Sequence, residues 1–445
     1  INAAGATTLA STAGWAMFDF GAASLRYLIV SAGSSIYASS DRGVTFGIIA
    51  SSRSQVYQSF ERSKPYLIAC SDTFDTTLYW AGTAATNMLS LAPGSAPGVK
   101  YAVDFQGFLM LMNSSSRKRG IYYADNNLIT TDPWTNSFDL PSSFDDEITG
   151  PIILNKKLYV FTKYKVFRIS YVGGNPDFAY QDVKEWGAVP RTIKKITLPE
   201  VGEVIICLGW DKKLRIFDGS EDEIISDTIE RNNNMSPVSL EQVATSVLDR
   251  SFAEVDTNEQ VYKLWVAITP SSQPTHMIAY NYRLEKGAFY AYQNQPYLSA
   301  VMAESGGTND RVLMATRSSG FIYKMDTLNT DAGVAVDEVY DSPFFFGRTP
   351  QVATKDQRIS FYFSVDSFGL LYFYDRVNFS NTFGQPRHTI SFVDTGGKVQ
   401  LVKTLDLSRT QNVYQFRVTS SASTAMPWRL NRYDLETSDL GVGRA

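Results

Sequence analysis

The residue types best suited to nucleophilic or metal chemistry are few and far apart in this chain of 445 residues. It has two cysteines, Cys70 and Cys207, and two histidines, His276 and His388. A zinc site needs several such ligands at short spacings, and a Cys–His or Ser–His pair would have to join distant segments. Each cysteine lies in an apolar run, which is typical of a small buried side chain. The sequence therefore predicts no catalytic residue, no metal site and no cofactor.

Two acidic turns and two aromatic segments offer weaker chemical signals. Residues 143–147 and 218–223 gather the oxygen ligands that calcium prefers, but neither turn has the alternating ligand spacing of an EF-hand. Solvated turns are the better interpretation of both. The aromatic residues at 289–292 and Trp134 would stack on sugars if they were exposed, although such residues more often pack in a core.

The segment 39–46 has the sharpest local pattern in the chain. It resembles the Asp-box, Ser-x-Asp-x-Gly-x-Thr-aromatic, of sialidase-like propellers. Its positions are filled by Ser39, Asp41, Gly43, Thr45 and Phe46. Asp41 can accept backbone N–H bonds and Gly43 can take a positive φ, which together build a tight turn after a strand. The role that this resemblance implies for the five residues is structural, and it supports a propeller fold.

Glycoside hydrolysis needs a more elaborate set of residues. A sialidase uses arginines from several blades to hold a carboxylate, a Tyr–Glu nucleophile pair and an acidic proton donor. Arg, Tyr and Glu are plentiful, so composition does not exclude such a site. However, Phe167, Arg168 and Ile169 are followed by Ser170 and not by the Pro of a Phe-Arg-Ile-Pro motif, and one Asp-box is clear where sialidases usually repeat it. We therefore do not expect an enzyme.

A β-hairpin pattern recurs along the chain. Each copy has an apolar strand, a short polar turn and a second strand with aromatic or branched residues. The second strands recur at Ile36, Tyr79, Ile121, Phe167, Arg215, Ile278 and Ile322. Most of these spacings are roughly 40 to 50 residues, the length of one four-stranded propeller blade. The sequence thus predicts an all-β fold, a β-propeller of about seven blades; tandem β-sandwiches are the alternative.

Two segments depart from the repeat. In 236–249 the apolar residues with helical spacing are Leu240, Val243, Val247 and Leu248. Ser239 with Gln242 could form a capping box, so a short helical insertion is expected. Beyond residue 341 the strands become longer and alternate between apolar and polar residues. We therefore expect a propeller over 1–341 and a separate C-terminal β-sandwich-like domain over 342–445.

Composition limits the partners. The formal net charge is −4 and charged residues make up 19% of the chain, without the basic stripe of a general nucleic-acid binder. No apolar run approaches the roughly 18 residues of a transmembrane helix, so no membrane-spanning segment is expected.

Several segments together resemble a family of virion proteins. They are the opening at 5–9, the hairpin 158–169, the run 214–219 with 225–229, and the closing 441–444. The family is the tail nozzle, or tail tubular protein B (head-to-tail stabilisation), of short-tailed bacteriophages. This resemblance implies a structural virion protein of the tail, assembled in the host cytoplasm, that forms a homo-oligomer, usually a hexamer. It also implies an adaptor or portal ring and tail fibre proteins as partners, and a channel that DNA passes through on ejection. The alternative is a carbohydrate- or receptor-binding propeller, and a sialidase-like glycosidase is less favoured.

Overall fold

The computed structural model describes most of the chain. The described residues are 14–22, 25–41, 43–54, 57–83, 86–91, 96–131, 133–174, 177–227, 229–230, 239–283, 288–304, 311–317, 322–325, 330–331, 334–335, 339–341, 345–346, 354–365, 369–377, 384–392, 399–411, 413–420 and 428–439. The segments 5–9, 236–238 and 441–444, together with Arg42, Thr228 and Asn412, lie outside them.

The chain divides into two compact units, and the first ends at Met325. Its described residues form seven antiparallel sheets, each built from consecutive strands, which we call blades 1 to 7. Six blades have four described strands and the seventh has three. Blades 1 to 3 contain β1 (Gly14–Ala22), β2 (Leu25–Ala32), β3 (Ser35–Ser39) and β4 (Gly47–Ala50); β5 (Gln58–Ser63), β6 (Tyr66–Ser71), β7 (Leu78–Trp80) and β8 (Leu89–Ser90); and β9 (Val99–Phe105), β10 (Phe108–Ser114), β11 (Gly120–Asp125) and β12 (Ser137–Asp139). Blades 4 and 5 contain β13 (Ile148–Leu154), β14 (Lys157–Thr162), β15 (Val166–Tyr171) and β16 (Phe178–Lys184); and β17 (Lys194–Leu198), β18 (Gly202–Leu208), β19 (Leu214–Phe217) and β20 (Asp222–Ile224). Blades 6 and 7 contain β21 (Phe252–Asp256), β22 (Val261–Val266), β23 (His276–Asn281) and β24 (Ala288–Tyr292); and β25 (Tyr297–Glu304), β26 (Arg311–Arg317) and β27 (Ile322–Lys324).

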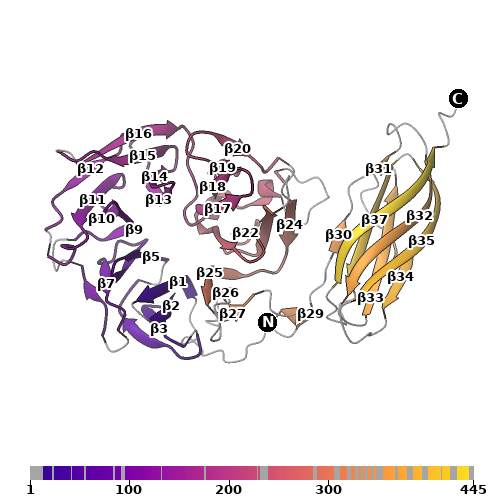
Figure 1. Ribbon diagram of the computed structural model, residues 1–445, viewed down its shortest axis with the longest axis horizontal. Helices are drawn as coiled ribbons and strands as arrows, with labels where there is room; N and C mark the ends of the chain where they lie inside the picture. Colours follow the sequence, from indigo (N-terminus) through magenta and orange to yellow (C-terminus); the bar gives the residue numbers. More distant parts are fainter. Residues whose placement is uncertain are drawn as a thin grey trace. The chain divides into compact units, whose positions relative to one another are not determined.

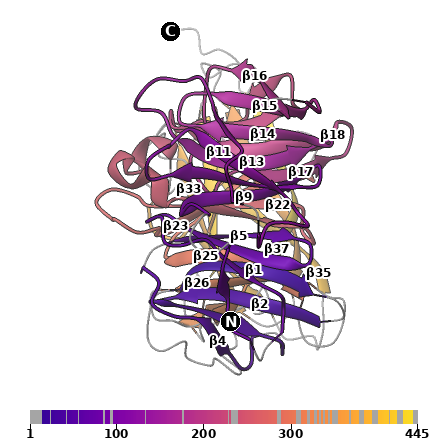
Figure 2. The same cartoon turned by 90° about the vertical axis from the view of Figure 1, so that its left-hand side faces the viewer.

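The seven sheets form a closed β-propeller, as the sequence predicts. The first strand of each blade contacts the first strands of its neighbours, and β25 of blade 7 contacts β1 of blade 1. In Figures 1 and 2, β1, β5 and β9 lie next to one another, and Figure 1 places the third and fourth strands further out. The ring is closed by a hydrogen bond from Thr316 Oγ1 to the carbonyl oxygen of Gly14 at 2.7 Å. The seven residues that define the repeat in the sequence, from Ile36 to Ile322, each lie on the third strand of a blade.

The apolar runs of the repeat arise because a blade is covered on both faces. On β14, Leu158 and Val160 pack in one cluster with Met110 of blade 3. The alternate residues Tyr159 and Phe161 pack in another cluster with Cys207 of blade 5. Successive side chains of a strand point to opposite faces, so a continuous apolar strand buries both faces between two neighbours. Cys70 is likewise buried, and both cysteines are free thiols.

The short helical insertion that the sequence predicts is present, but it is interrupted. The structure has two short 3-10 helices, η1 (Leu240–Gln242) and η2 (Thr245–Arg250), in place of one longer helix. Val243 between them is extended and forms a β-bridge with Ile268, which interrupts the helical hydrogen bonds. Gln242 Oε1 still accepts a bond from the backbone N–H of Ser239 at 3.0 Å, which is one half of the expected capping box. Burial of Val243 against the blades therefore outweighs its helical spacing.

The second unit begins after Met325, earlier than the sequence boundary at residue 341. Its short strands are β28 (Thr330–Asp331), β29 (Val334–Ala335), β30 (Val339–Asp341) and β31 (Phe345–Phe346). Its longer strands are β32 (Thr354–Val365), β33 (Gly369–Val377), β34 (His388–Phe392), β35 (Val399–Gln411), β36 (Val413–Ser420) and β37 (Trp428–Asp439). The observed boundary lies before the predicted one. Strand β30 (Val339–Asp341) pairs with β36 and therefore belongs to the C-terminal unit.

Two larger sheets form the body of this C-terminal unit, and β28 pairs with β29 in a separate two-stranded sheet. One joins β30, β36, β33 and β34, with β31 also on β36, and the other joins β35, β32 and β37. Phe361 and Phe363 of β32 pack against Phe373 and Phe416 of the facing sheet in a buried cluster. Apolar residues alternate along these strands because one face is inward, which is the arrangement of a β-sandwich. None of the described helices is long and apolar enough to cross a membrane.

Candidate functional site: a charged network at one end of the propeller

Loops from several blades meet at one end of the propeller. In a blade of four antiparallel strands, the turn between the second and third strands and the link from the previous blade lie at the same end. In this chain those loops include 72–77, 140–147, 163–165 and 185–193. We call the cross-blade contacts of Lys100, Glu147, Lys163, Arg191, Tyr57 and Asp72 the end network. This end joins residues from blades 2 to 5, and a backbone oxygen of the link into blade 6 takes part.

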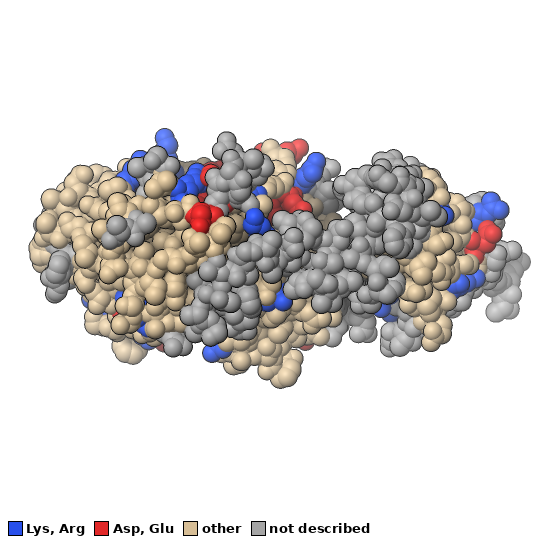
Figure 3. Space-filling view, turned by 90° about the horizontal axis from the view of Figure 1, so that it is seen from below, with Lys and Arg blue, Asp and Glu red and all other residues tan. Residues whose placement is uncertain are grey.

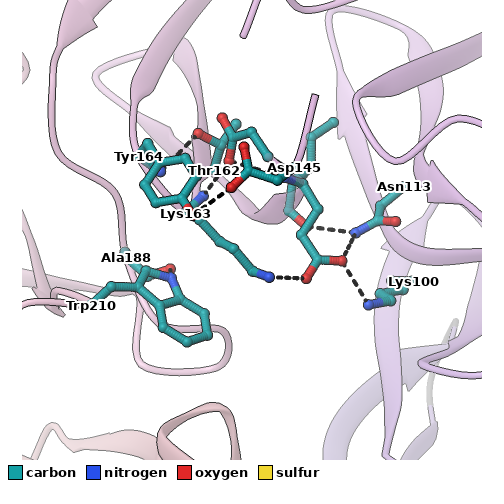
Figure 4. Close-up of polar contacts among 11 residues, drawn as sticks. Lys100, Asn113, Asp145, Thr162, Lys163, Tyr164, Ala188 and Trp210 are labelled. Carbon is teal, nitrogen blue, oxygen red and sulfur yellow. Dashed lines mark hydrogen bonds and ion pairs between the residues drawn. The ribbon is translucent and has the colours of Figure 1, made fainter. Parts of the chain in front are cut away.

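Glu147 is the centre of one half of the end network. Its Oε2 lies 3.1 Å from Lys100 Nζ and its Oε1 lies 2.9 Å from Lys163 Nζ, so one carboxylate joins blade 3 to the second–third strand turn of blade 4 (Figure 4). Lys163 Nζ also lies 5.5 Å from the ring centroid of Trp210 of blade 5. Burial alone would raise the pKa of Glu147, but the bond from Lys163 and the two lysine charges lower that pKa to about 2. Glu147 is thus an ionised cross-link.

Arg191 is the centre of the other half. Its Cζ lies 3.4 Å from the ring centroid of Tyr57, and its Nη1 lies 3.8 Å from Asp72 Oδ2, so a loop entering blade 5 contacts blade 2. Its Nη2 donates to the carbonyl oxygen of Asp249 in η2. The backbone of Arg191 has a φ of 62°, a region that non-glycine residues rarely adopt. A strained backbone thus places this guanidinium among three blades.

The first acidic turn, 143–147, is part of this end and is occupied by the protein's own donors. Asp146 Oδ1 accepts the backbone N–H groups of Glu147 and Lys163, each at 2.9 Å. Asp145 Oδ2 accepts the hydroxyl of Tyr164 at 3.1 Å. These bonds fix the turn and leave its carboxylates with partners that are not metals.

The second acidic turn, 218–223, lies at the opposite end of blade 5. Asp218 Oδ1 accepts the backbone N–H groups of Ser220 at 2.7 Å and Glu221 at 2.8 Å, as in an Asx turn. Asp222 pairs with Lys184 of blade 4 at 2.7 Å. Among the residues that the structure describes, no group of three or more His, Cys, Asp or Glu side chains could hold a metal ion.

The Asp-box residues form a turn between β3 and β4. Asp41 Oδ1 accepts the backbone N–H groups of Val44 at 3.1 Å and Thr45 at 2.8 Å, and Gly43 has a φ of 91°. Ser39 Oγ accepts the backbone N–H of Gly43 at 2.7 Å. Phe46 packs beside the cluster that joins blades 1 and 7. The motif therefore shapes a blade turn and lies away from the end network.

The comparisons with known proteins give no function. No protein-family model matches the chain, and no curated protein matches it. Among solved structures, BBS1N in complex with ARL6DN is 12% identical, covers 72% of this chain and 94% of its own, and has a TM-score of 0.42. The extracellular domain of BT4673 from B. thetaiotaomicron is 10% identical over 90% of this chain and 48% of its own, with a TM-score of 0.43. An exo-β-1,3-galactanase from Phanerochaete chrysosporium is 11% identical over 94% of this chain and 95% of its own, with a TM-score of 0.27.

Other residues that stand out in the sequence lie in ordinary surroundings. Burial raises the pKa of Cys70 and of Cys207 to about 12, so both remain thiols and neither is an activated nucleophile. Burial lowers the pKa of His276, whose Nδ1 lies 2.8 Å from Thr275 Oγ1. Trp134 is 3% exposed and belongs to the core. Its burial excludes a direct role in sugar stacking.

The aromatic segment 289–292, which the sequence singles out, is partly exposed. In this segment, Tyr290 is 47% and Tyr292 is 43% exposed, while Phe289 packs on the core of blades 5 and 6.

The sequence gives no indication of Arg191, Tyr57 and Asp72 as members of a site. They lie in three irregular loops, and no motif or period marks them before the ring brings them together.

Proposed function

We propose that this protein is a non-enzymatic structural component of a short-tailed phage tail, of the nozzle type. The observation that carries the proposal is a seven-bladed propeller followed by a separately packed β-sandwich. A propeller platform is what the sequence resemblance implies, and the second unit supplies a further surface for assembly. In such a particle, copies of the chain lie side by side beneath the adaptor ring and surround the path of the DNA.

The end network suits a mechanical role. Glu147 and Arg191 each connect elements of different blades, and Lys194 pairs with Glu254 across blades 5 and 6 at 2.6 Å. Cross-links between blades resist the separation of sheets that otherwise contact only their neighbours. On the face seen in Figure 3, the described Lys and Arg residues lie in small groups, several beside Asp or Glu. A wall of mixed charge would hold phosphates weakly, and weak contacts suit the passage of DNA.

Assembly of the full chain tests this function. The purified protein is measured by mass photometry and negative-stain imaging, alone and with an adaptor ring protein from a short-tailed phage. We expect closed rings of about six copies, alone or on the adaptor, because identical subunits that repeat one heterologous contact close into a ring. A chain that stays monomeric at micromolar concentration and ignores the adaptor would overturn the proposal.

A further inference from the structure

A recess between blades 3 and 4 lies at the end of the blades opposite the end network. It has a volume of about 260 Å³ and sits beside the turns that join β9 to β10 and β13 to β14. Phe105 and Ile169 are buried beneath it and give it an apolar floor. Tyr171, at the end of β15, forms part of its wall.

Tyr171 is a fixed aromatic platform. Its side chain is 48% exposed, yet its ring lies 5.5 Å from the ring of Phe108 and 5.5 Å from the ring of Phe178. These contacts hold the ring in place and leave its remaining surface open. Tyr171 thus offers an exposed apolar ring surface together with a polar hydroxyl group, and the ring surface suits the C–H face of a sugar.

Four polar side chains lie around this platform. Gln106, Lys156, Lys157 and Ser170 line the recess, and within the described structure none of these four side chains makes a hydrogen bond or ion pair. Gln106 and Lys156 occupy turn positions with φ of 55° and 63°, so short hairpins set their places. None of the described residues that line the recess is acidic. The recess thus combines an amide, a hydroxyl and two cations beside one aromatic ring.

We propose that this recess binds one unit of an acidic saccharide, such as a uronic acid within a polysaccharide. The sugar ring lies on Tyr171, its hydroxyl groups bond to Gln106 and Ser170, and its carboxylate pairs with Lys156 and Lys157. The volume is below the roughly 300–1,000 Å³ of pockets for drug-sized ligands, so it fits a single ring and not a longer segment. The proposal is independent of tail assembly, because one chain holds the whole recess.

Titration of the full chain with oligosaccharides tests the proposal. The probes are tetragalacturonate and, as the neutral match, maltotetraose, measured by calorimetry at low and moderate salt. The test variants are Lys156→Gln combined with Lys157→Gln, and Tyr171→Ser. The matched controls are Lys118→Gln and Tyr290→Ser, which change an exposed lysine and an exposed tyrosine elsewhere on the propeller.

We expect the wild-type chain to bind tetragalacturonate more tightly than maltotetraose, with affinity that falls as salt rises. Binding should weaken at least tenfold in the double lysine variant and in Tyr171→Ser, and stay unchanged in both controls. Circular dichroism checks that each variant is folded. Absence of binding to tetragalacturonate, equal binding of the neutral probe, or binding that the lysine and tyrosine variants leave intact would each overturn the proposal. Ring formation is scored separately, so failure here leaves the tail proposal standing.

Discussion

The guanidinium of Arg191 lies over the ring of Tyr57, with Cζ 3.4 Å from the ring centroid. Arg191 enters blade 5 and Tyr57 enters blade 2, so the contact crosses the end of the ring and does not join adjacent sheets. Tyr57 is buried, and a cation–π contact is stronger where water is excluded. This pair therefore holds distant blades in one arrangement.

Removing the Arg191 side chain should destabilise the propeller. We expect Arg191→Ala to lower the free energy of unfolding by about 1–2 kcal/mol, the size of a partly desolvated cation–π contact. The free energy of unfolding of Arg191→Lys should fall between those of the wild type and Arg191→Ala, because an ammonium keeps the charge but cannot stack as a planar guanidinium does. Both variants keep a Cβ at the same positive φ, so the strain of the backbone is the same in the two variants and does not contribute to the difference between them.

Urea unfolding followed by tryptophan fluorescence measures the Arg191 effect. The matched control is Lys195→Ala, whose exposed pair with Glu203 at 2.8 Å should contribute less than about 0.5 kcal/mol. Equal losses in Arg191→Ala and Lys195→Ala would show that the contact with Tyr57 is not a cross-link.

Acid should remove the stabilisation that Glu147 provides. Its pKa is about 2 in the folded protein, against an ordinary value of 4.5, so the folded chain binds fewer protons than the unfolded chain between those values. The stabilisation is fully present above pH 4.5 and is lost as the pH falls towards 2. The shift corresponds to roughly 3 kcal/mol at most.

Comparing Glu147→Gln with the wild type across pH measures this linkage. The variant should be less stable at pH 7, and the difference should shrink steadily below pH 4.5. Glu185→Gln is the control, because the Glu185 side chain is 77% exposed in its pair with Lys165 and should matter little. A difference that stays constant from pH 7 to pH 2.5 would contradict the assigned role.

The sequence predicts the repeated hairpins well and the end network not at all. Leu158 and Phe167 lie in local runs whose periodicity and turns follow from burial on two faces, so each blade is visible by itself. Arg191 and Asp72 are adjacent because the ring closes, and loop residues carry no periodic signal of that closure. Val243 shows the intermediate case: its spacing indicates a helix, while its bridge to Ile268 depends on a distant strand.

The Asp-box glycine provides a second, local prediction. Gly43 has a φ of 91°, and a Cβ there would lie 3.3 Å from Leu28 Cδ2. Gly43→Ala should cost about 1–2 kcal/mol, because a side chain is disfavoured in the left-handed region. Gly47 is the matched control, since it is a nearby glycine with open space around its Cβ position. If thermal unfolding shifts equally in Gly43→Ala and Gly47→Ala, the turn does not require the glycine.

Closure of the ring between blades 7 and 1 gives the sharpest prediction. A Cβ on Gly14 would lie 2.8 Å from Thr316 Cβ, whereas one on Gly21 of the same strand meets nothing closer than 3.8 Å. Gly14→Ala should therefore push β1 from β26 and cost about 1–3 kcal/mol, as overpacking does. Gly21→Ala should be nearly neutral. Hydrogen exchange of the amides in β1 and β25 reports where the ring loosens.

A double variant separates closure from a general loss of stability. Thr316→Ala removes the bond to the Gly14 carbonyl oxygen. It also removes Cγ2 and Oγ1, two of the three Thr316 atoms that a new Cβ would crowd, and leaves only Thr316 Cβ. Adding it to Gly14→Ala should cost less than the sum of the two single changes, because both act on one contact. Strictly additive losses, or faster exchange spread evenly over all blades, would mean that this contact does not close the ring. Faster exchange confined to β1, β25 and β26 would instead identify the junction of blades 7 and 1 as the place where the propeller opens first.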